Sequence, residues 1–94
     1  MLDKMKELWA MKSKMDEIKK GLDSLVLASE DNLVKVSITG SQEVKGVEIK
    51  CDLASVDKKK LEAALAETIN RAVRESQKAA AQKMSALGGL PGLG

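Results

Sequence analysis

The first part of the chain carries apolar side chains at the spacing of an α-helix. Every third or fourth residue is apolar, namely Leu8, Met11, Met15, Ile18 and Leu22. This spacing gathers them into one stripe, as at the a and d positions of a heptad. Gly21 follows Lys19 and Lys20, an arrangement that suits a helix end. We predict a helix over residues 2 to about 20, which could extend because the stripe continues to Leu25.

The middle of the chain changes to the two-residue period of β-strands. Residues 33–39 place one set of apolar side chains on a single face: Val34, Val36 and Ile38. Residues 43–51 alternate again, and their apolar face holds Val47, Ile49 and Cys51. The turn residues 40–42 lie between them, so the two runs predict an antiparallel hairpin. Residues 24–29 are expected to add a third strand, with a turn at residues 30–32.

The last long segment returns to the helical period. From Asp57 onward one helical face holds Leu61, Leu65, Ile69, Ala72, Val73, Ser76, Ala80, Met84 and Leu87. Ser55 or Asp57 is a suitable N-cap, and Gly88-Gly89 stops the helix. The prediction is an α/β fold of the α+β type: a helix, a three-stranded antiparallel sheet and a long helix. It has one domain, residues 1–87, and a flexible Gly/Leu/Pro tail, residues 88–94.

The length of the predicted last helix indicates a homodimer. A helix over residues 57–86 is roughly 45 Å long, whereas a globule of this size is only about 30 Å across. The helix therefore overshoots the body, and the first helix is the available partner within the chain. Sheet edges also need cover, so we expect two copies to pair and leave helices projecting like the arms of tweezers. The alternative is a compact monomer whose last helix breaks early, but nothing between Asp57 and Gly88 interrupts the pattern.

The apolar stripes supply the residues that we assign to the core or the dimer interface. They are Leu8, Met11, Met15, Ile18, Val34, Val36, Ile38, Val47 and Ile49. The chain has five Met and one Trp but no Phe or Tyr, so this core lacks large aromatic side chains. Pairing with a second copy would cover the remaining apolar surface.

Charge is unevenly distributed along the chain. The net charge is only +2, which is a weak argument for a nucleic-acid partner. Residues 1–20 carry six basic and four acidic side chains, and residues 57–94 carry seven and four. Residues 21–56 carry three basic and six acidic side chains. The helices are therefore positive and the strand region is negative, which polarises the assembly.

Three cations in the last helix share one exposed ridge. Arg71, Arg74 and Lys78 fall within about 60° of one another at ~100° per residue, opposite the apolar stripe. Such a row suits the regular line of phosphates along a duplex. For each residue alone, a solvated helix surface is the simpler interpretation. The asymmetry of the whole set favours a functional one.

Trp9, with Leu2 and Met5, falls beside the main stripe of the first helix. We expect these side chains to widen the apolar face and pack against the partner subunit. One alternative is an exposed wedge that touches DNA or another protein. A third is adsorption to a membrane, which the mixed charges of the polar face disfavour.

The residues of an active site are missing. The chain has no His and only one Cys, so the commonest general base and a zinc site are excluded. We predict no enzymatic activity, no cofactor and no metal. Cys51 alone cannot form an intramolecular disulfide, which fits a reducing cytoplasm. Asp3 and Glu7 near the N-terminus argue against a secretory signal, and no apolar run is long enough to span a membrane.

Three segments in order resemble a known family. They are KMKELWAMKSKM at the start, VKVSITGSQEVKGVEIK in the middle, and a long Ala-rich helix ending KMSALGGLPGLG. The chain is similar along its whole length to the YbaB/EbfC family of bacterial nucleoid-associated DNA-binding proteins. The resemblance implies a dimer joined through its sheets, with projecting helices that bind double-stranded DNA with modest sequence preference in the cytoplasmic nucleoid.

The resemblance also assigns DNA contacts to the projecting helices. The matching basic positions of this chain are Lys4, Lys6, Lys12, Arg71, Arg74, Lys78 and Lys83. The chain departs from the family at residues 29–32, where Ser-Glu-Asp-Asn replaces a Gly-rich segment, so no DNA contact is expected there. A second hypothesis is a protein-interaction module whose arms grip a partner protein and have little affinity for DNA.

Overall fold

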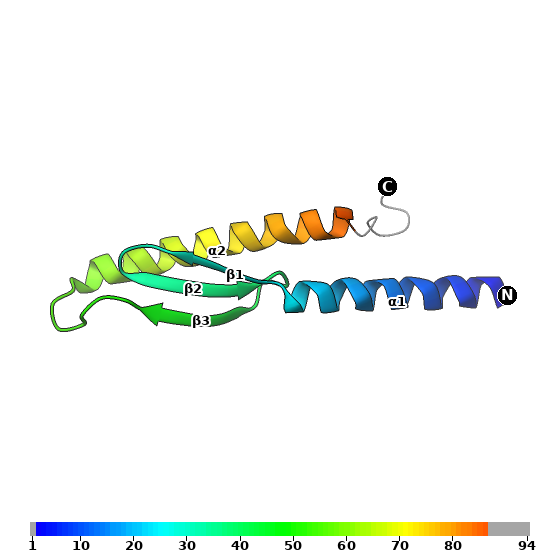
Figure 1. Ribbon diagram of the computed structural model, residues 1–94, viewed down its shortest axis with the longest axis horizontal. Helices are drawn as coiled ribbons and strands as arrows, with labels where there is room; N and C mark the ends of the chain where they lie inside the picture. The colour runs from blue at the N-terminus through cyan, green and yellow to red at the C-terminus, as the bar shows by residue number, and fades with distance from the viewer. Residues whose placement is uncertain (1, 87–94) are drawn as a thin grey trace.

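A computed structural model describes residues 2–86 and has the predicted order of helix, three strands and helix (Figure 1). The elements are α1 (Leu2–Ser24), β1 (Val26–Glu30), β2 (Val34–Thr39), β3 (Val44–Ile49) and α2 (Lys58–Ala86). Both strand pairs are antiparallel, in the order β1-β2-β3. The α+β fold and its third strand are thus confirmed. Leu87, the Gly88-Gly89 stop and the tail at residues 88–94 lie outside the described residues.

The helix ends differ in one place from the prediction. α1 continues through Gly21 to Ser24, so an end at Gly21 is wrong and the extension indicated by the apolar stripe is confirmed. At Gly21 an added Cβ would meet only the far end of the flexible Lys83 side chain, at 2.6 Å from its Cε, so α1 and α2 lie side by side here with a lysine stem between them. Asp57 is the N-cap of α2: the Lys60 N–H donates to its Oδ2 at 3.0 Å.

The core lies between α2 and the first two strands. Val34, Val36 and Ile38 of β2 are fully buried. The α2 side chains that meet the sheet are small and four residues apart: Ala64, Thr68, Ala72 and Ser76. The larger side chains predicted to form the buried stripe are only half-buried beside this row: Leu61, Leu65, Ile69 and Val73. Because the β-branched side chains of β2 already fill the space, the helix approaches through its small residues.

Two hydroxyls in this row predict opposite effects on stability. The Ser76 hydroxyl donates to the Thr39 carbonyl at 2.6 Å and is buried. Thr68 Oγ1 is buried and has no hydrogen-bond partner in the described part of the chain. We expect Ser76→Ala to lower the free energy of unfolding by about 1–2 kcal/mol, whereas Thr68→Val, which removes an unpaired hydroxyl at constant shape, should raise it by about 1 kcal/mol. Urea unfolding of both variants measures the two signs, and equal signs would contradict this description of the packing.

A bulge changes the face of β3. Ser37 pairs with Gly46 and Ile38 pairs with Val44, so Lys45 has no partner in β2. The bulge turns Val44 to the same side of the sheet as the core. Val44, Val47 and Ile49 lie opposite the three buried residues of β2, yet they remain 44%, 47% and 38% exposed. The strand also ends before Cys51, so the predicted alternation up to that residue is wrong.

The turn between β1 and β2 depends on Asp31. Its Oδ1 accepts the N–H groups of Leu33 at 2.8 Å and Val34 at 2.9 Å. These two hydrogen bonds hold the pKa of the Asp31 carboxyl below its ordinary value of 3.8. The ionised Asp31 carboxyl therefore stabilises the folded protein at pH values above the ordinary pKa of 3.8. This stabilisation is lost as the pH falls through the lower pKa that the carboxyl has in the folded state.

Asp31→Asn tests this pH dependence. The variant should melt at a lower temperature than the parent protein near neutral pH, because a neutral amide oxygen accepts these N–H groups less strongly. The difference should shrink in acid, where the parent carboxyl is also uncharged. Thermal melts from neutral pH to below pH 3.8 would show the convergence. A constant difference across that range would mean that the charge of Asp31 is irrelevant to the turn.

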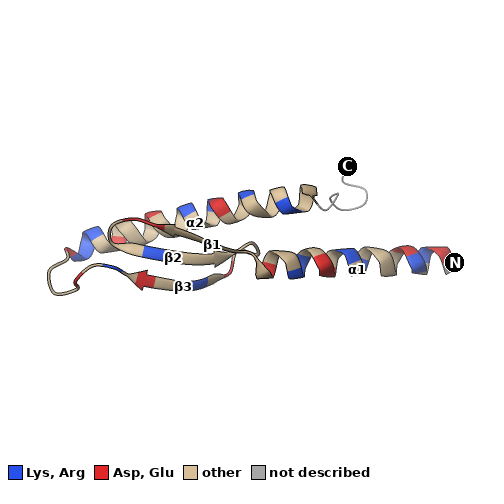
Figure 2. Cartoon of the chain, in the orientation of Figure 1, with Lys and Arg blue, Asp and Glu red and all other residues tan. Residues whose placement is uncertain are grey.

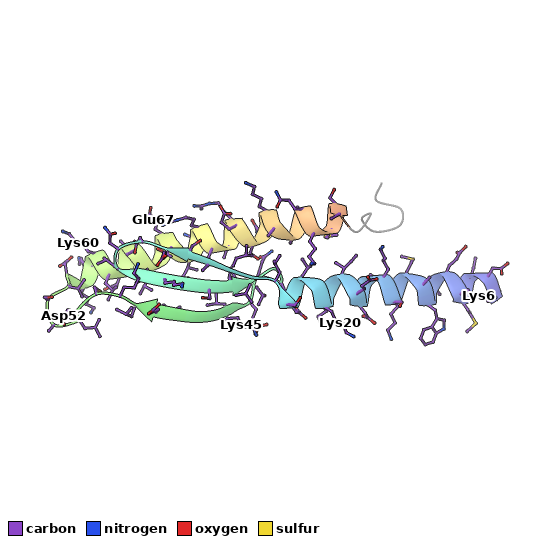
Figure 3. The ribbon with its side chains drawn as sticks, in the orientation of Figure 1. Lys6, Lys20, Lys45, Asp52, Lys60 and Glu67 are labelled. Atoms are coloured by element: carbon purple, nitrogen blue, oxygen red, sulfur yellow. The ribbon has the colours of Figure 1, made fainter. Side chains whose placement is uncertain are left out.

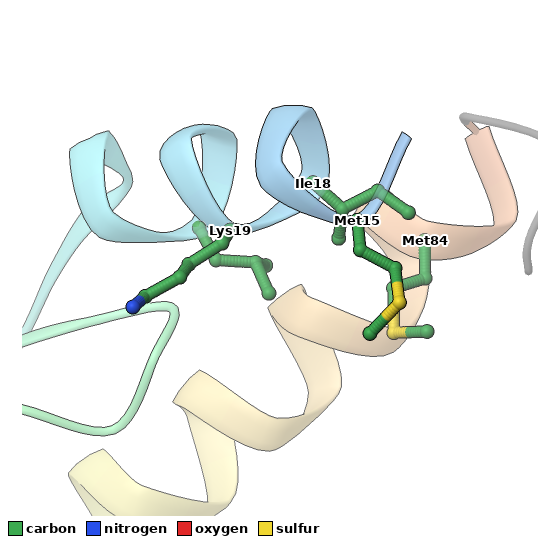
Figure 4. Close-up of a pocket in the computed structure, with 5 residues that line it drawn as sticks. Met15, Ile18, Lys19 and Met84 are labelled. Atoms are coloured by element: carbon green, nitrogen blue, oxygen red, sulfur yellow. The ribbon is translucent and has the colours of Figure 1, made fainter. Parts of the chain in front are cut away.

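The molecule is elongated because α1 projects away from the sheet (Figure 1). Its extents are 67 × 19 × 17 Å. α1 meets α2 near the last turns of α2, where a hollow is lined by Met15, Ile18, Lys19, Leu22 and Met84 (Figure 4). α2 does run past the sheet, as predicted, but α1 is the longer projection. The expectation that α1 covers the stripe of α2 holds only for the last turns, because β1 and β2 cover the rest.

Candidate nucleic-acid interface

The positive excess of the protein lies on α2. With the observed helix bounds, α2 carries seven basic and three acidic side chains, whereas α1 carries six and five. Figure 2 shows blue and red along both helices, with blue the more frequent colour along α2. The predicted surplus of the first helix is smaller because α1 extends to include Asp23.

The outward face of α2 presents two exposed cations. Arg74 and Lys78 each follow a buried residue, Ala72 or Ser76, by two positions. Two residues turn a helix by about 200°, so both side chains point away from the sheet. Lys60 lies five whole turns before Lys78 on the same side of the helix, but the exposed Glu67 lies between them, and Figure 3 shows Lys60 and Glu67 both pointing outward. We call Arg74 and Lys78 the α2 basic face.

The other two cations predicted on α2 are partly engaged within the protomer. The Arg71 guanidinium donates from Nη1 to the Glu30 carbonyl at 3.3 Å, and its side chain is half-buried at the end of β1. The Lys83 side chain is half-buried too, with its stem against Gly21 of α1. These contacts could not be read from helical periodicity, because both depend on which element α2 packs against.

The predicted basic residues of α1 lie on a separate surface. Lys4, Lys6 and Lys12 are exposed in the first half of α1. Figure 3 shows Lys6 near the end of α1 that projects beyond α2. Lys12 Nζ lies 5.8 Å from the centre of the Trp9 ring, which is itself 67% exposed. One protomer therefore presents two basic surfaces and does not join them.

The residues assigned to the core or the dimer interface divide into two groups. Ile18, Val34, Val36 and Ile38 are buried within the protomer. The others are exposed: Leu8, Met11, Met15, Val47 and Ile49. These five are therefore not buried core residues of the single chain, although Met15 adjoins Met84 of α2, and their assignment to a dimer interface stays a prediction.

An uncovered apolar surface runs along β3 and the adjoining flank of α2. Arg71 reaches the end of β1, so the opposite flank of α2 faces β3. That flank carries Leu61, Leu65, Ile69 and Val73, all half-buried. Together with Val44, Val47 and Ile49 they form what we call the β3 apolar surface. The outer edge of β3 pairs with no strand of the described chain, so its backbone groups face solvent beside this surface.

The described residues hold no group of three or more side chains arranged to bind a metal ion. Cys51 is a free, half-buried thiol just after β3. Neither helix between residues 2 and 86 is apolar enough over a sufficient length to cross a bilayer.

Comparison with known proteins agrees with this arrangement. The chain is 35% identical over 85 residues to nucleoid-associated proteins of Legionella pneumophila strains Corby and Paris, covering 88% of this chain and 76% of theirs. A crystal structure of an uncharacterized Helicobacter pylori protein shares the fold, with a TM-score of 0.74 at 19% identity over 87% of this chain and 89% of that one. Residues 1–90 match the model of the YbaB/EbfC DNA-binding family. The chain is thus a member of the YbaB/EbfC DNA-binding family, as the three sequence segments indicated.

Proposed function

We propose that the protein binds double-stranded DNA as a homodimer, mainly through phosphate contacts from the α2 basic face. The observation that carries the proposal is the outward position of Arg74 and Lys78, which are exposed on the helix with the positive excess. Cations along a straight helix match the repeating phosphates of a duplex and read no particular sequence. Binding of this kind alters DNA conformation or gene expression in the nucleoid of the cytoplasm. Family membership supports the DNA partner.

The dimer is part of the proposal because each protomer leaves the β3 apolar surface uncovered. Two copies related by a two-fold axis would pair their β3 edges and bury Val44, Val47 and Ile49 against the same residues of the partner. The outer strand edge would then gain backbone hydrogen bonds. Such an assembly carries two α2 basic faces, so each DNA contact is made twice.

The competing function is a protein-interaction module. It is favoured by the exposed apolar side chains of the α1 arm, among them Met5, Leu8 and Trp9. This module would have the same fold and dimer but little affinity for DNA at physiological salt.

Titration of a labelled duplex with the protein at several salt concentrations separates the two functions. DNA binding predicts an affinity that falls steeply with salt, because each phosphate contact contributes about 0.9 to the slope of log K against log salt. Light scattering of the protein without DNA should give twice the mass of one chain. Absence of binding at low salt would leave the protein-interaction module as the better description.

A further inference from the structure

Trp9 is the sole tryptophan of a chain without Phe or Tyr, and it lies in solvent on the projecting half of α1. The side of α1 that meets α2 carries Met15 and Ile18. Trp9 lies six residues before Met15 and is therefore rotated about 120° from it around the helix. No described element of the protomer covers the indole, which borders a shallow hollow with Leu8 and Lys12.

Two lysines flank the indole on the same side of the helix. Lys6 precedes Trp9 by three residues and Lys12 follows it by three, so each lies about 60° to one side of it. The Lys12 amine is 5.8 Å from the ring centre, in cation–π range. The nearest acidic residue in sequence, Glu7, is two positions away and points to the opposite side. The charged side chains one turn to either side of Trp9 are therefore both lysines, and the first acidic side chain on the same line of the helix, Asp16, lies two turns farther on.

We propose that Trp9 is a wedge that enters the minor groove of bound duplex DNA, with Lys6 and Lys12 on the phosphates of the two flanking strands. The proposal rests on the DNA binding proposed above and adds the side chain that deforms the duplex. Lys6 and Lys12 lie about 9 Å apart along the helix axis, at ~1.5 Å per residue, and the minor groove is about 6 Å wide. The two amines can thus reach both walls of the groove while the ring faces its floor.

Charge complementarity favours DNA over the other occupants of this surface. Apolar side chains that enter the minor groove unstack a base step and bend the duplex, and here the flanking cations hold the backbone on either side. A second copy paired about a two-fold axis at Trp9 would bring lysines of both copies close to one another. A membrane surface suits a helix whose polar face is uniformly basic, whereas α1 also carries Asp3, Glu7, Asp16 and Glu17.

The intrinsic fluorescence of Trp9 tests the contact without a label on the protein. Addition of duplex DNA should quench the emission and protect the indole from acrylamide. Trp9→Ala should weaken DNA binding about tenfold, consistent with a stacking contact, and Trp9→Phe should retain most of the affinity. Energy transfer between dyes at the two ends of the duplex should report bending by the parent protein and little bending by Trp9→Ala.

Leu53→Ala is the matched control, because Leu53 is also 67% exposed but lies in the loop before α2. It should leave affinity and bending unchanged. The wedge is overturned if Trp9 emission is unaltered when a gel shift shows saturated DNA, an outcome that leaves DNA binding itself intact. It is equally overturned if the indole is shielded in the free dimer, or if anionic vesicles change the emission and DNA does not. A failure of the parent protein to shift DNA at all would instead refute the proposed function.

Discussion

The double variant Arg74→Ala/Lys78→Ala is expected to bind duplex DNA more weakly than the parent protein. At about 0.15 M salt, each protomer that contacts the DNA should contribute a loss of roughly 30-fold in affinity. Both side chains are exposed on the outer face of α2, so their loss removes phosphate contacts without disturbing the core. The slope of log K against log salt should fall by about 1.8 for each protomer. Fluorescence anisotropy of duplexes with unrelated sequences measures both effects, which should be equal across sequences.

A second double variant that removes two positive charges elsewhere separates the effect of position from the effect of net charge. Lys20→Ala/Lys35→Ala also removes two cations, one from the last turns of α1 and one from β2, and neither lies on the α2 basic face or on β3. Its DNA affinity should stay within about twofold of the parent value, since distant surface charges are largely screened at this salt. If the two double variants lose affinity equally, the protein binds DNA through its general charge and the α2 basic face has no special role.

Val47→Asp is expected to dissociate the dimer. In the protomer Val47 is 47% exposed, so the aspartate should not unfold a single chain. In the proposed dimer the same side chain is buried against its partner, and an unpaired charge there costs about 3–5 kcal/mol. The dissociation constant of the dimer should therefore rise by more than about 100-fold. DNA affinity should fall with it, because a single protomer presents only one α2 basic face.

Val26→Asp is the control for the interface. Val26 is 60% exposed on β1, at the opposite edge of the sheet, and it faces away from the core. This variant should retain twice the mass of one chain in light scattering and an unchanged circular dichroism spectrum. If Val26→Asp breaks the dimer and Val47→Asp does not, the copies join through β1, and the β3 apolar surface has another partner.

The order of elements could be predicted from the sequence because each element has its own hydrophobic period. The faces could not be predicted as well. In α2 the large side chains mark an amphipathic helix, but the sheet selects the adjoining row of small residues, Ala64, Thr68, Ala72 and Ser76. In β3 the bulge at Lys45 shifts the alternation, so that Val44 joins the apolar face. Such choices depend on packing between elements, which a one-dimensional pattern does not contain.

The candidate interface could be predicted only where it depends on helical spacing alone and not on packing between elements. Helical spacing identified the outward positions of Arg74 and Lys78. It could not show that Arg71 bonds to the Glu30 carbonyl or that the stem of Lys83 packs on Gly21. A glycine within a helical pattern does not by itself mark a helix end, and α1 continues through Gly21 to Ser24.

The salt dependence of DNA affinity for the unmodified protein tests the central claim most directly. A dimer that presents Arg74 and Lys78 from both copies makes at least four phosphate contacts, which predicts a straight log–log plot with a slope near −3.6 or steeper. A slope near zero, or no detectable binding in dilute salt, would contradict the assignment of the α2 basic face to the DNA backbone.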